Sequence, residues 1–136
     1  MADSPCTERD VVLIVDDQEI ITEMISELVG IHGCAHVAFT DPAEALRHYR
    51  EHAKEITLLI TDLTMPSMSG PEFVRKALEI NPALSTILVA NYAGEPMPDD
   101  MPRLVSRIVE KPFTQSELLD AVRKALTKAD RQDSRS

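Results

Sequence analysis

Residues 11–17 read VVLIVDD, an uninterrupted apolar run that ends in two acidic residues. Such a run of β-branched residues and leucine is typical of a strand that is buried on both faces of a parallel sheet. Residues 18–31 follow with apolar side chains at helical spacing, among them Ile21, Ile25 and Leu28. A buried strand followed by an amphipathic helix is the first part of a βαβ unit, and it predicts an α/β protein.

The alternation of strand and helix continues along the chain. Helices are predicted from Pro42, from Pro71 and from the capping box of Thr114 and Glu117. Further strands are predicted over residues 34–39, 56–61, 86–90 and 105–109. The pattern therefore predicts a flavodoxin-like, doubly wound five-stranded parallel sheet in the order 2-1-3-4-5.

The domain organisation follows from the length and from the polar ends. A chain of 136 residues suits one domain. We expect a polar N-terminal leader over residues 1–10, the domain over residues 11–129 and a polar C-terminal tail over residues 130–136. Three prolines within residues 91–106 forbid a long helix there, so the fourth helix is expected to be irregular or shortened and to lie near residues 99–104.

The composition excludes several classes of function. The net charge of −9 makes the chain a poor binder of nucleic acid or of an anionic membrane, because both are negatively charged. No apolar run is long enough to span a bilayer. Cys6 and Cys34 form no CxxC pair, and a disulfide between them is left open without support. Because the first residues also lack the apolar stretch of a signal peptide, we expect a cytoplasmic protein.

Acidic residues end two of the predicted strands. Asp16 and Asp17 follow the first strand and Asp62 follows the third, and these two strands are neighbours in the predicted order. Lys111 follows the fifth strand at the same edge of the sheet. Singly, such residues usually face solvent. Together, three crowded carboxylates favour a divalent cation such as Mg²⁺, and the lysine is a point charge suited to a phosphoryl oxygen.

Three segments in this order carry a resemblance to a known family. They are VVLIVDD at 11–17, LLITDLTMPSMSGPEF at 58–73 and KPF at 111–113. With them the chain resembles a response-regulator receiver domain of two-component signalling over residues 11–129. The wording after Asp62 is similar to that of stand-alone or hybrid-kinase-associated receivers.

The resemblance implies a role for each matching residue. Asp62 would accept a phosphoryl group from the phosphohistidine of a sensor histidine kinase or of a histidine phosphotransfer protein. Asp17 would bind Mg²⁺ directly, Asp16 would help through water or a hydrogen bond, and the backbone carbonyl of Thr64 would be a further ligand. Lys111 would contact the phosphoryl group. Such a protein is not an enzyme for other substrates, since it promotes only its own phosphorylation and dephosphorylation.

Two positions depart from the family pattern. Ala90 stands where family members usually carry the hydroxyl of Thr or Ser, and Ile108 stands where they carry Tyr or Phe. In the family these two groups transmit phosphorylation to the output face, so we expect an intact phosphorylation site with an atypical switch. Alternatively, the alignment shifts by one residue and the amide of Asn91 supplies the missing hydrogen-bond donor.

Three functions compete at this point. The first is a phospho-accepting receiver that signals by binding a downstream protein, whose identity the sequence does not name. The second is a pseudo-receiver that binds its partner independently of phosphorylation. The third is a phosphate hydrolase with an aspartyl nucleophile, and it ranks last because Thr64 stands where such enzymes carry a second Asp. Homodimer formation is left open.

Overall fold

Five parallel strands form the centre of the protein in the order β2-β1-β3-β4-β5, which confirms the predicted sheet. The computed structural model describes the backbone of residues 4–135 and the side chains of residues 4–127. The strands are β1 (Val11–Val15), β2 (Ala35–Phe39), β3 (Leu58–Asp62), β4 (Ser85–Ala90) and β5 (Arg107–Glu110). The helices are α1 (Glu19–Ile31), α2 (Pro42–His52), α3 (Gly70–Ile80), α4 (Met101–Leu104) and α5 (Gln115–Arg135).

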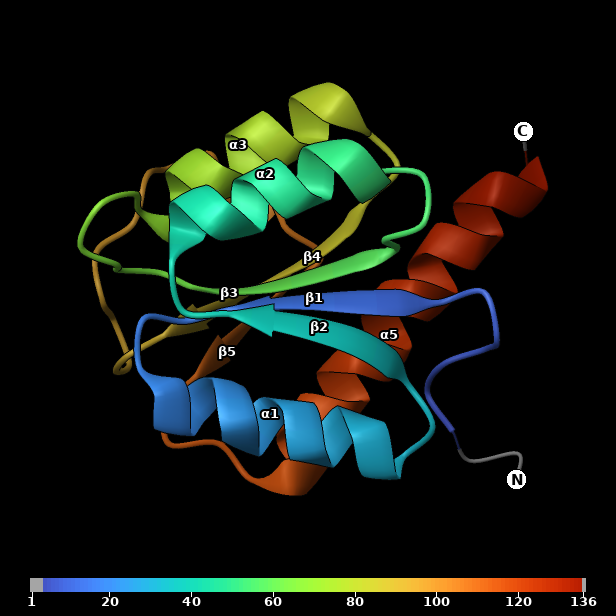
Figure 1. The fold of residues 1–136 in the computed structure, drawn as a ribbon, viewed down its shortest axis with the longest axis horizontal. Coiled ribbons are helices and arrows are strands. Elements are labelled where there is room, and N and C mark those ends of the chain that lie inside the picture. The colour runs from blue at the N-terminus through green and yellow to red at the C-terminus, as the bar shows by residue number, and fades with distance from the viewer. Residues whose placement is uncertain (1–3, 136) are drawn as a thin grey trace.

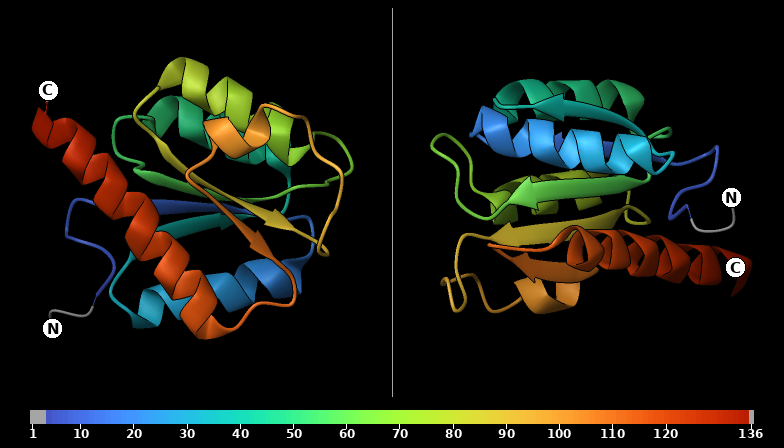
Figure 2. Two further views of the ribbon diagram at one scale, coloured as in Figure 1. Left: turned by 180° about the vertical axis from the view of Figure 1, so that it is seen from behind. Right: turned by 90° about the horizontal axis from the view of Figure 1, so that it is seen from below.

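The sheet lies between two layers of helices. Figure 1 shows α2 and α3 on one face and α1 and α5 on the other. In the view from behind, the short α4 lies beside α3 (Figure 2). Each face has its own apolar core: Ile25 and Val122 belong to the core under α1 and α5, and Tyr49, Phe73 and Met101 belong to the opposite one. The central strands β1, β3 and β4 are therefore buried on both sides.

The helix starts follow the signals in the sequence. Asp41 caps α2 by accepting a hydrogen bond from the backbone N–H of Ala43 at 3.0 Å. In the capping box of α5, the Thr114 hydroxyl accepts from the Glu117 N–H at 3.0 Å and the Glu117 carboxylate accepts from the Thr114 N–H at 2.7 Å. These side chains satisfy backbone donors that a helix cannot satisfy itself. The predicted capping box is confirmed.

The fourth and fifth helices compare differently with the prediction. The fourth helix is shortened to four residues, as expected. By contrast, α5 continues to Arg135, past Ala129 where the sequence indicated a polar tail. No glycine or proline lies between Gln115 and Arg135, so nothing in the backbone chemistry ends the helix earlier. No helix in the described part of the chain is both long enough and apolar enough to cross a bilayer.

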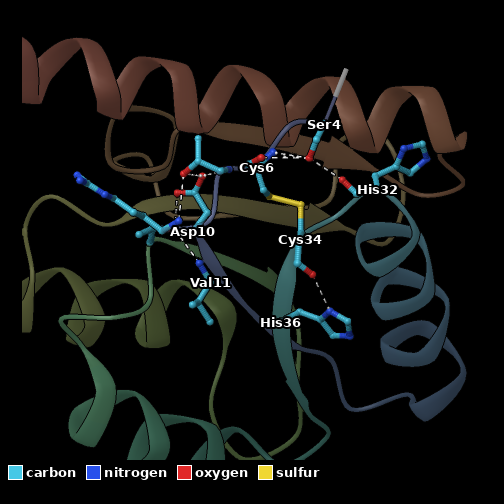
Figure 3. Close-up of a disulfide and its surroundings, with 10 residues drawn as sticks. Ser4, Cys6, Asp10, Val11, His32, Cys34 and His36 are labelled. Carbon is cyan, nitrogen blue, oxygen red and sulfur yellow. Dashed lines mark hydrogen bonds between the residues drawn. A yellow bond between two sulfur atoms is a disulfide. The ribbon is translucent and has the colours of Figure 1, made fainter. Parts of the chain in front are cut away.

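The N-terminal leader is attached to the domain by a disulfide that the sequence left unsupported. Cys6 and Cys34 are bonded, with their Cα atoms 5.3 Å apart (Figure 3). Both cysteines are buried in the core beneath α1 and α5. The Ser4 hydroxyl adds a hydrogen bond of 2.6 Å to the carbonyl oxygen of His32. Within the described residues, the leader is thus joined to the domain from Ser4 onward by the disulfide and this hydrogen bond.

Reduction of this disulfide is expected to destabilise the protein. The bond closes a loop with a sequence separation of 28 residues. Closing a loop of this size is worth about 3.5 kcal/mol in the chain-entropy treatment, so the reduced protein should lose about that much free energy of unfolding. Urea unfolding with and without dithiothreitol measures the difference. The double variant Cys6→Ser/Cys34→Ser is the control and should be insensitive to dithiothreitol. Equal unfolding midpoints for the oxidised and reduced wild type would contradict the expectation.

Candidate functional site

The sheet topology brings the three predicted acids to one edge. Strands β1 and β3 are neighbours, and Val15 lies opposite Thr61 in their register. Asp16 and Asp62 therefore leave adjacent strands side by side, and Asp17 follows. One carboxylate oxygen from each lies within 4.8 Å of the others. The loops after β1, β3 and β4 gather at the left side of the molecule in Figure 1. This is the carboxyl edge, where open α/β sheets bind their ligands.

Asp62 is a buried carboxylate with a perturbed pKa. Its side chain is almost inaccessible to solvent, with 3% of the residue exposed. Its Oδ1 accepts a hydrogen bond from the backbone N–H of Leu63 at 3.0 Å. Burial, followed by repulsion from Asp16 and Asp17, raises the pKa of Asp62 to about 6, while Lys111 and the Leu63 N–H act in the opposite direction. The charge on Asp62 is thus poorly compensated by protein groups alone, as expected of a site that takes a cation.

Lys111 reaches the acids from the end of β5. Its Nζ donates to Asp16 Oδ2 at 3.2 Å and lies 3.7 Å from Asp62 Oδ1. It also donates to the side-chain oxygen of Asn91 at 3.1 Å. The ammonium group therefore lies between β1, β3 and β4 and offers a positive charge to an anion bound at this edge. The predicted placement of the lysine beside the acids is confirmed.

Gly70 allows α3 to begin directly against the Asp62 backbone. A Cβ atom at this position would overlap the carbonyl oxygen of Asp62 and the side chain of Leu88. The Gly70 N–H donates to the Leu63 carbonyl at 2.9 Å and closes the loop between β3 and α3. Only glycine permits this approach of two backbones. The loop that carries Thr64 is positioned by this contact.

Ala90 and Ile108, the two positions expected to be atypical, lie on β4 and β5. Ala90 is the buried last residue of β4, and its carbonyl accepts from the Lys111 N–H at 2.9 Å. No side-chain donor stands there. Ile108 lies on β5, is 37% exposed and lines a surface groove of about 540 Å³ between β5 and α5. Asn91 follows Ala90, and its amide is already bound to Lys111 and to a carboxylate that sequence reasoning missed.

That carboxylate is Glu95, in the loop between β4 and α4. It accepts from the Asn91 backbone N–H at 2.6 Å, from the Asn91 side chain at 3.3 Å and from the Thr64 hydroxyl at 2.6 Å. Burial raises the pKa of Glu95, but these hydrogen bonds and the charge of Lys111 outweigh it and lower the pKa below its ordinary value. No spacing or motif marks Glu95, because its partners lie in two loops. The only signal in the sequence is an acid in a proline-rich loop.

The donor set at this edge fits a magnesium ion. Three carboxylates converge within 4.8 Å, one is exposed and two are buried. Mg²⁺ prefers oxygen ligands and keeps several waters, so it needs few protein ligands and one open side. Asp17, on the exposed side, provides that access. The roles that the resemblance implies for Asp16, Asp17, Asp62 and the Thr64 carbonyl remain predictions, and the geometry is compatible with them.

Comparison with known proteins identifies the family to which the chain belongs. The family model of the response regulator receiver domain matches residues 12–123. The chain belongs to this family. Receiver domains act in two-component signal transduction, bind Mg²⁺ at an acidic pocket, accept phosphoryl groups and interact with histidine kinases or phosphotransfer proteins.

Individual relatives are similar to this chain over most of its length. It is 29% identical over 120 residues to the response regulator receiver protein CpdR of Brucella abortus, a match that covers 87% of this chain and 98% of CpdR. The sensor kinase CckA of the same organism is 26% identical over 88% of this chain, which corresponds to 13% of CckA. The chain spans about half the length of FixJ and TmoT, two further regulators.

A solved structure confirms the receiver fold. The receiver domain protein from Clostridium thermocellum superimposes with a TM-score of 0.80 at 25% identity, over 90% of this chain and 98% of that one. The sheet order β2-β1-β3-β4-β5 with helices on both faces is therefore the family's own architecture.

Proposed function

We propose that this receiver domain accepts a phosphoryl group from a phosphohistidine donor on Asp62, with Mg²⁺ bound by Asp16, Asp17, Asp62 and the Thr64 carbonyl. The observation that carries the proposal is the set of charges around Asp62: the carboxylates of Asp16 and Asp17 lie within 4.8 Å, and the Lys111 ammonium lies 3.7 Å from Asp62 Oδ1. In such a site a bound cation would reduce the repulsion between the nucleophilic carboxylate and the neighbouring acids. The lysine ammonium would pair with the phosphoryl oxygens.

Asp62 and Lys111 have separate roles in the proposed transfer. Asp62 Oδ1 is held by the Leu63 N–H, and among the described residues no hydrogen bond to Oδ2 is found, which leaves Oδ2 as the attacking atom. Oδ2 forms a bond to phosphorus while the bond from phosphorus to the histidine nitrogen breaks, and the histidine leaves with that electron pair. Lys111 pairs with a phosphoryl oxygen. Bound Mg²⁺ supplies further neutralisation of the negative charge.

The donor and the output follow from the family and from the atypical positions. We propose that the donor is a sensor histidine kinase or a histidine phosphotransfer protein and that the domain is not an enzyme for other substrates. Another protein binds the phosphorylated domain and transmits the signal. We propose a cytoplasmic location, which cell fractionation checks. Because Ala90 has no hydroxyl and Ile108 has no ring, the response to phosphorylation differs from the usual relay between these two positions.

Beryllium fluoride, a mimic of an aspartyl phosphate, tests the proposal. Backbone amides are followed by NMR as Mg²⁺ and beryllium fluoride are added. We expect shifts at Asp17, Asp62, Lys111 and the loop after β4, with little change on β5 and α5 around Ile108. The variant Asp62→Asn is the control and should not respond to beryllium fluoride.

Two other outcomes have distinct meanings. Shifts that spread over Ile108 and the groove-facing side of α5 would contradict the atypical switch and leave phosphoryl acceptance intact. A folded wild type with no response would contradict phosphoryl acceptance itself. The absence of a hydroxyl at Ala90 and of a ring at Ile108 would then favour the alternative, a pseudo-receiver that binds its partner independently of phosphorylation.

A further inference from the structure

Glu95 accepts hydrogen bonds from donors that lie next to the acid site. Its Oε1 accepts from the Asn91 backbone N–H, and its Oε2 accepts from the Asn91 side chain and the Thr64 hydroxyl. Three donors from two loops thus converge on one carboxylate. Asn91 in turn accepts from Lys111, whose ammonium lies 3.7 Å from Asp62. The donors that Glu95 occupies therefore lie one hydrogen bond away from the lysine of the site.

The loop after β4 is built to hold Glu95 in this place. The Glu95 N–H donates to the Tyr92 carbonyl at 3.2 Å, and Gly94 has a φ of +82°. A glycine with positive φ at the third position of a turn is typical of a type II turn, which brings the Glu95 side chain back over Asn91. Farther along, Asp100 is bound to Arg75 of α3 at 2.6 Å. The loop is thus held at both of its ends.

We propose that Glu95 is an internal latch: in the unphosphorylated protein it occupies the donors of Asn91 and Thr64, and a phosphoryl group on Asp62 displaces it. The proposal rests on Asp62 being the phosphoryl acceptor. A phosphoryl group brings negative charge and several strong acceptor oxygens to the Lys111 side of Asn91. It repels the Glu95 carboxylate and competes with it for the same donors, since like charges at short range disfavour one another.

In this proposal the loop over residues 91–100 changes on phosphorylation, in place of the hydroxyl and ring that the family usually carries at Ala90 and Ile108. Release of Glu95 frees the loop from Asn91 to Asp100 from its contact with Thr64. Ala90 and Ile108 cannot carry a signal through a hydroxyl and a ring, whereas this loop leads directly into α4. The hydrogen bonds of Glu95 found among the described side chains go to Asn91 and Thr64 and to none of Asp16, Asp17 and Asp62, so it is a positioning residue that acts through Asn91 and Thr64.

The rate of phosphorylation by phosphoramidate tests the latch. Wild type, Glu95→Gln and Asp99→Asn are incubated with Mg²⁺ and phosphoramidate, and the phosphorylated fraction is followed by intact mass. Glu95→Gln removes the charge at nearly constant shape, and we expect phosphorylation about tenfold faster, the equivalent of one charge-assisted hydrogen bond. Asp99→Asn removes a charge from an exposed position in the same loop and should stay within about twofold of wild type. The advantage of Glu95→Gln should shrink in high salt.

Each outcome separates the latch from the proposed function. If wild type is phosphorylated and Glu95→Gln reacts at the same rate or more slowly, Glu95 only braces the loop and the latch is wrong. Equal acceleration by Asp99→Asn would reduce the effect to net charge and would also overturn the latch. A wild type that takes no phosphoryl group overturns phosphoryl acceptance and the latch with it.

An NMR measurement keeps the latch testable if the variant folds poorly. In wild type, addition of Mg²⁺ and beryllium fluoride should shift the Asn91 amide and the Thr64 and Glu95 signals together, because one contact is broken. A shift at Asp62 and Lys111 with unchanged Glu95 signals would contradict displacement of the carboxylate.

Discussion

Replacement of Asp62 by asparagine should stabilise the metal-free protein at neutral pH, although it removes the proposed phosphoryl acceptor. Burial and the neighbouring acids raise the pKa of Asp62 from an ordinary value of 3.8 to about 6. Such a shift corresponds to about 3 kcal/mol of unfavourable free energy when the group is ionised in the folded state. Asparagine has the same shape without the charge, so we expect the free energy of unfolding to rise by about 2–3 kcal/mol above pH 7.

The pH dependence gives this prediction its sign. The folded state binds the Asp62 proton more tightly than the unfolded state, so low pH favours the folded state of the wild type. It loses this stability as the pH rises from about 4 through about 6. The difference between Asp62→Asn and wild type should therefore be small at pH 4 and reach its full size near pH 7. Urea unfolding at several pH values, without Mg²⁺, measures it.

Magnesium and a matched variant serve as controls for Asp62→Asn. Mg²⁺ should stabilise the wild type more than the variant, since the ion compensates the charge that asparagine lacks. Asp99→Asn, which removes an exposed carboxylate from the loop before α4, should change the free energy of unfolding by less than about 0.5 kcal/mol. An Asp62→Asn protein less stable than wild type at every pH would refute the strained-carboxylate account of the site.

Replacement of Gly70 by alanine should damage both folding and the site. A Cβ atom at Gly70 would overlap the Asp62 carbonyl oxygen, and the Leu88 side chain closes the remaining space. Both obstacles belong to buried strands, so neither can move without disturbing the core. Overpacking of this kind costs about 1–3 kcal/mol, and a clash with backbone lies at the upper end. We expect a loss of about 3 kcal/mol in the free energy of unfolding.

Gly94→Ala is the matched comparison for Gly70→Ala. Gly94 has a φ of +82°, but a Cβ atom there would meet no other atom within 4 Å. Its replacement should cost about 1 kcal/mol, the price of a left-handed backbone alone. Thermal unfolding compares the two, and the Mg²⁺ and beryllium fluoride response of Gly70→Ala reports whether Asp62 has shifted. Equal stability losses would show that the contact with Asp62 is not the reason for glycine at position 70.

Much of the candidate site could be predicted from the sequence. A strand that is buried on both faces has an unmistakable apolar pattern, and the acid after it is then placed at the carboxyl edge. Asp16, Asp62 and Lys111 were assigned to one edge by this reasoning, and the structure brings them together. The strands predicted over residues 86–90 and 105–109 contain Ala90 and Ile108, which lie on β4 and β5, and the family resemblance singled out these two positions.

The loops were beyond this kind of prediction. Glu95 and Asn91 are four residues apart, but their contact depends on the turn at Gly94 and on where the loop after β3 places Thr64. The sequence allows Asn91 as a donor to a phosphoryl group, whereas in the structure its side-chain amide donates to Glu95. The length of a helix without a breaker was equally hard to judge, and α5 ran past its expected end.

The sequence by itself determined the sheet, its order and the acids at its edge, because periodicity and strand ends are local properties that each segment carries alone. Only the tertiary structure decided the contacts between segments. It joined Cys6 to Cys34, placed α3 against Asp62 at Gly70 and set Glu95 over Asn91. Each of these contacts depends on the distance between two segments after packing. The local sequence pattern of either segment carries no information about that distance.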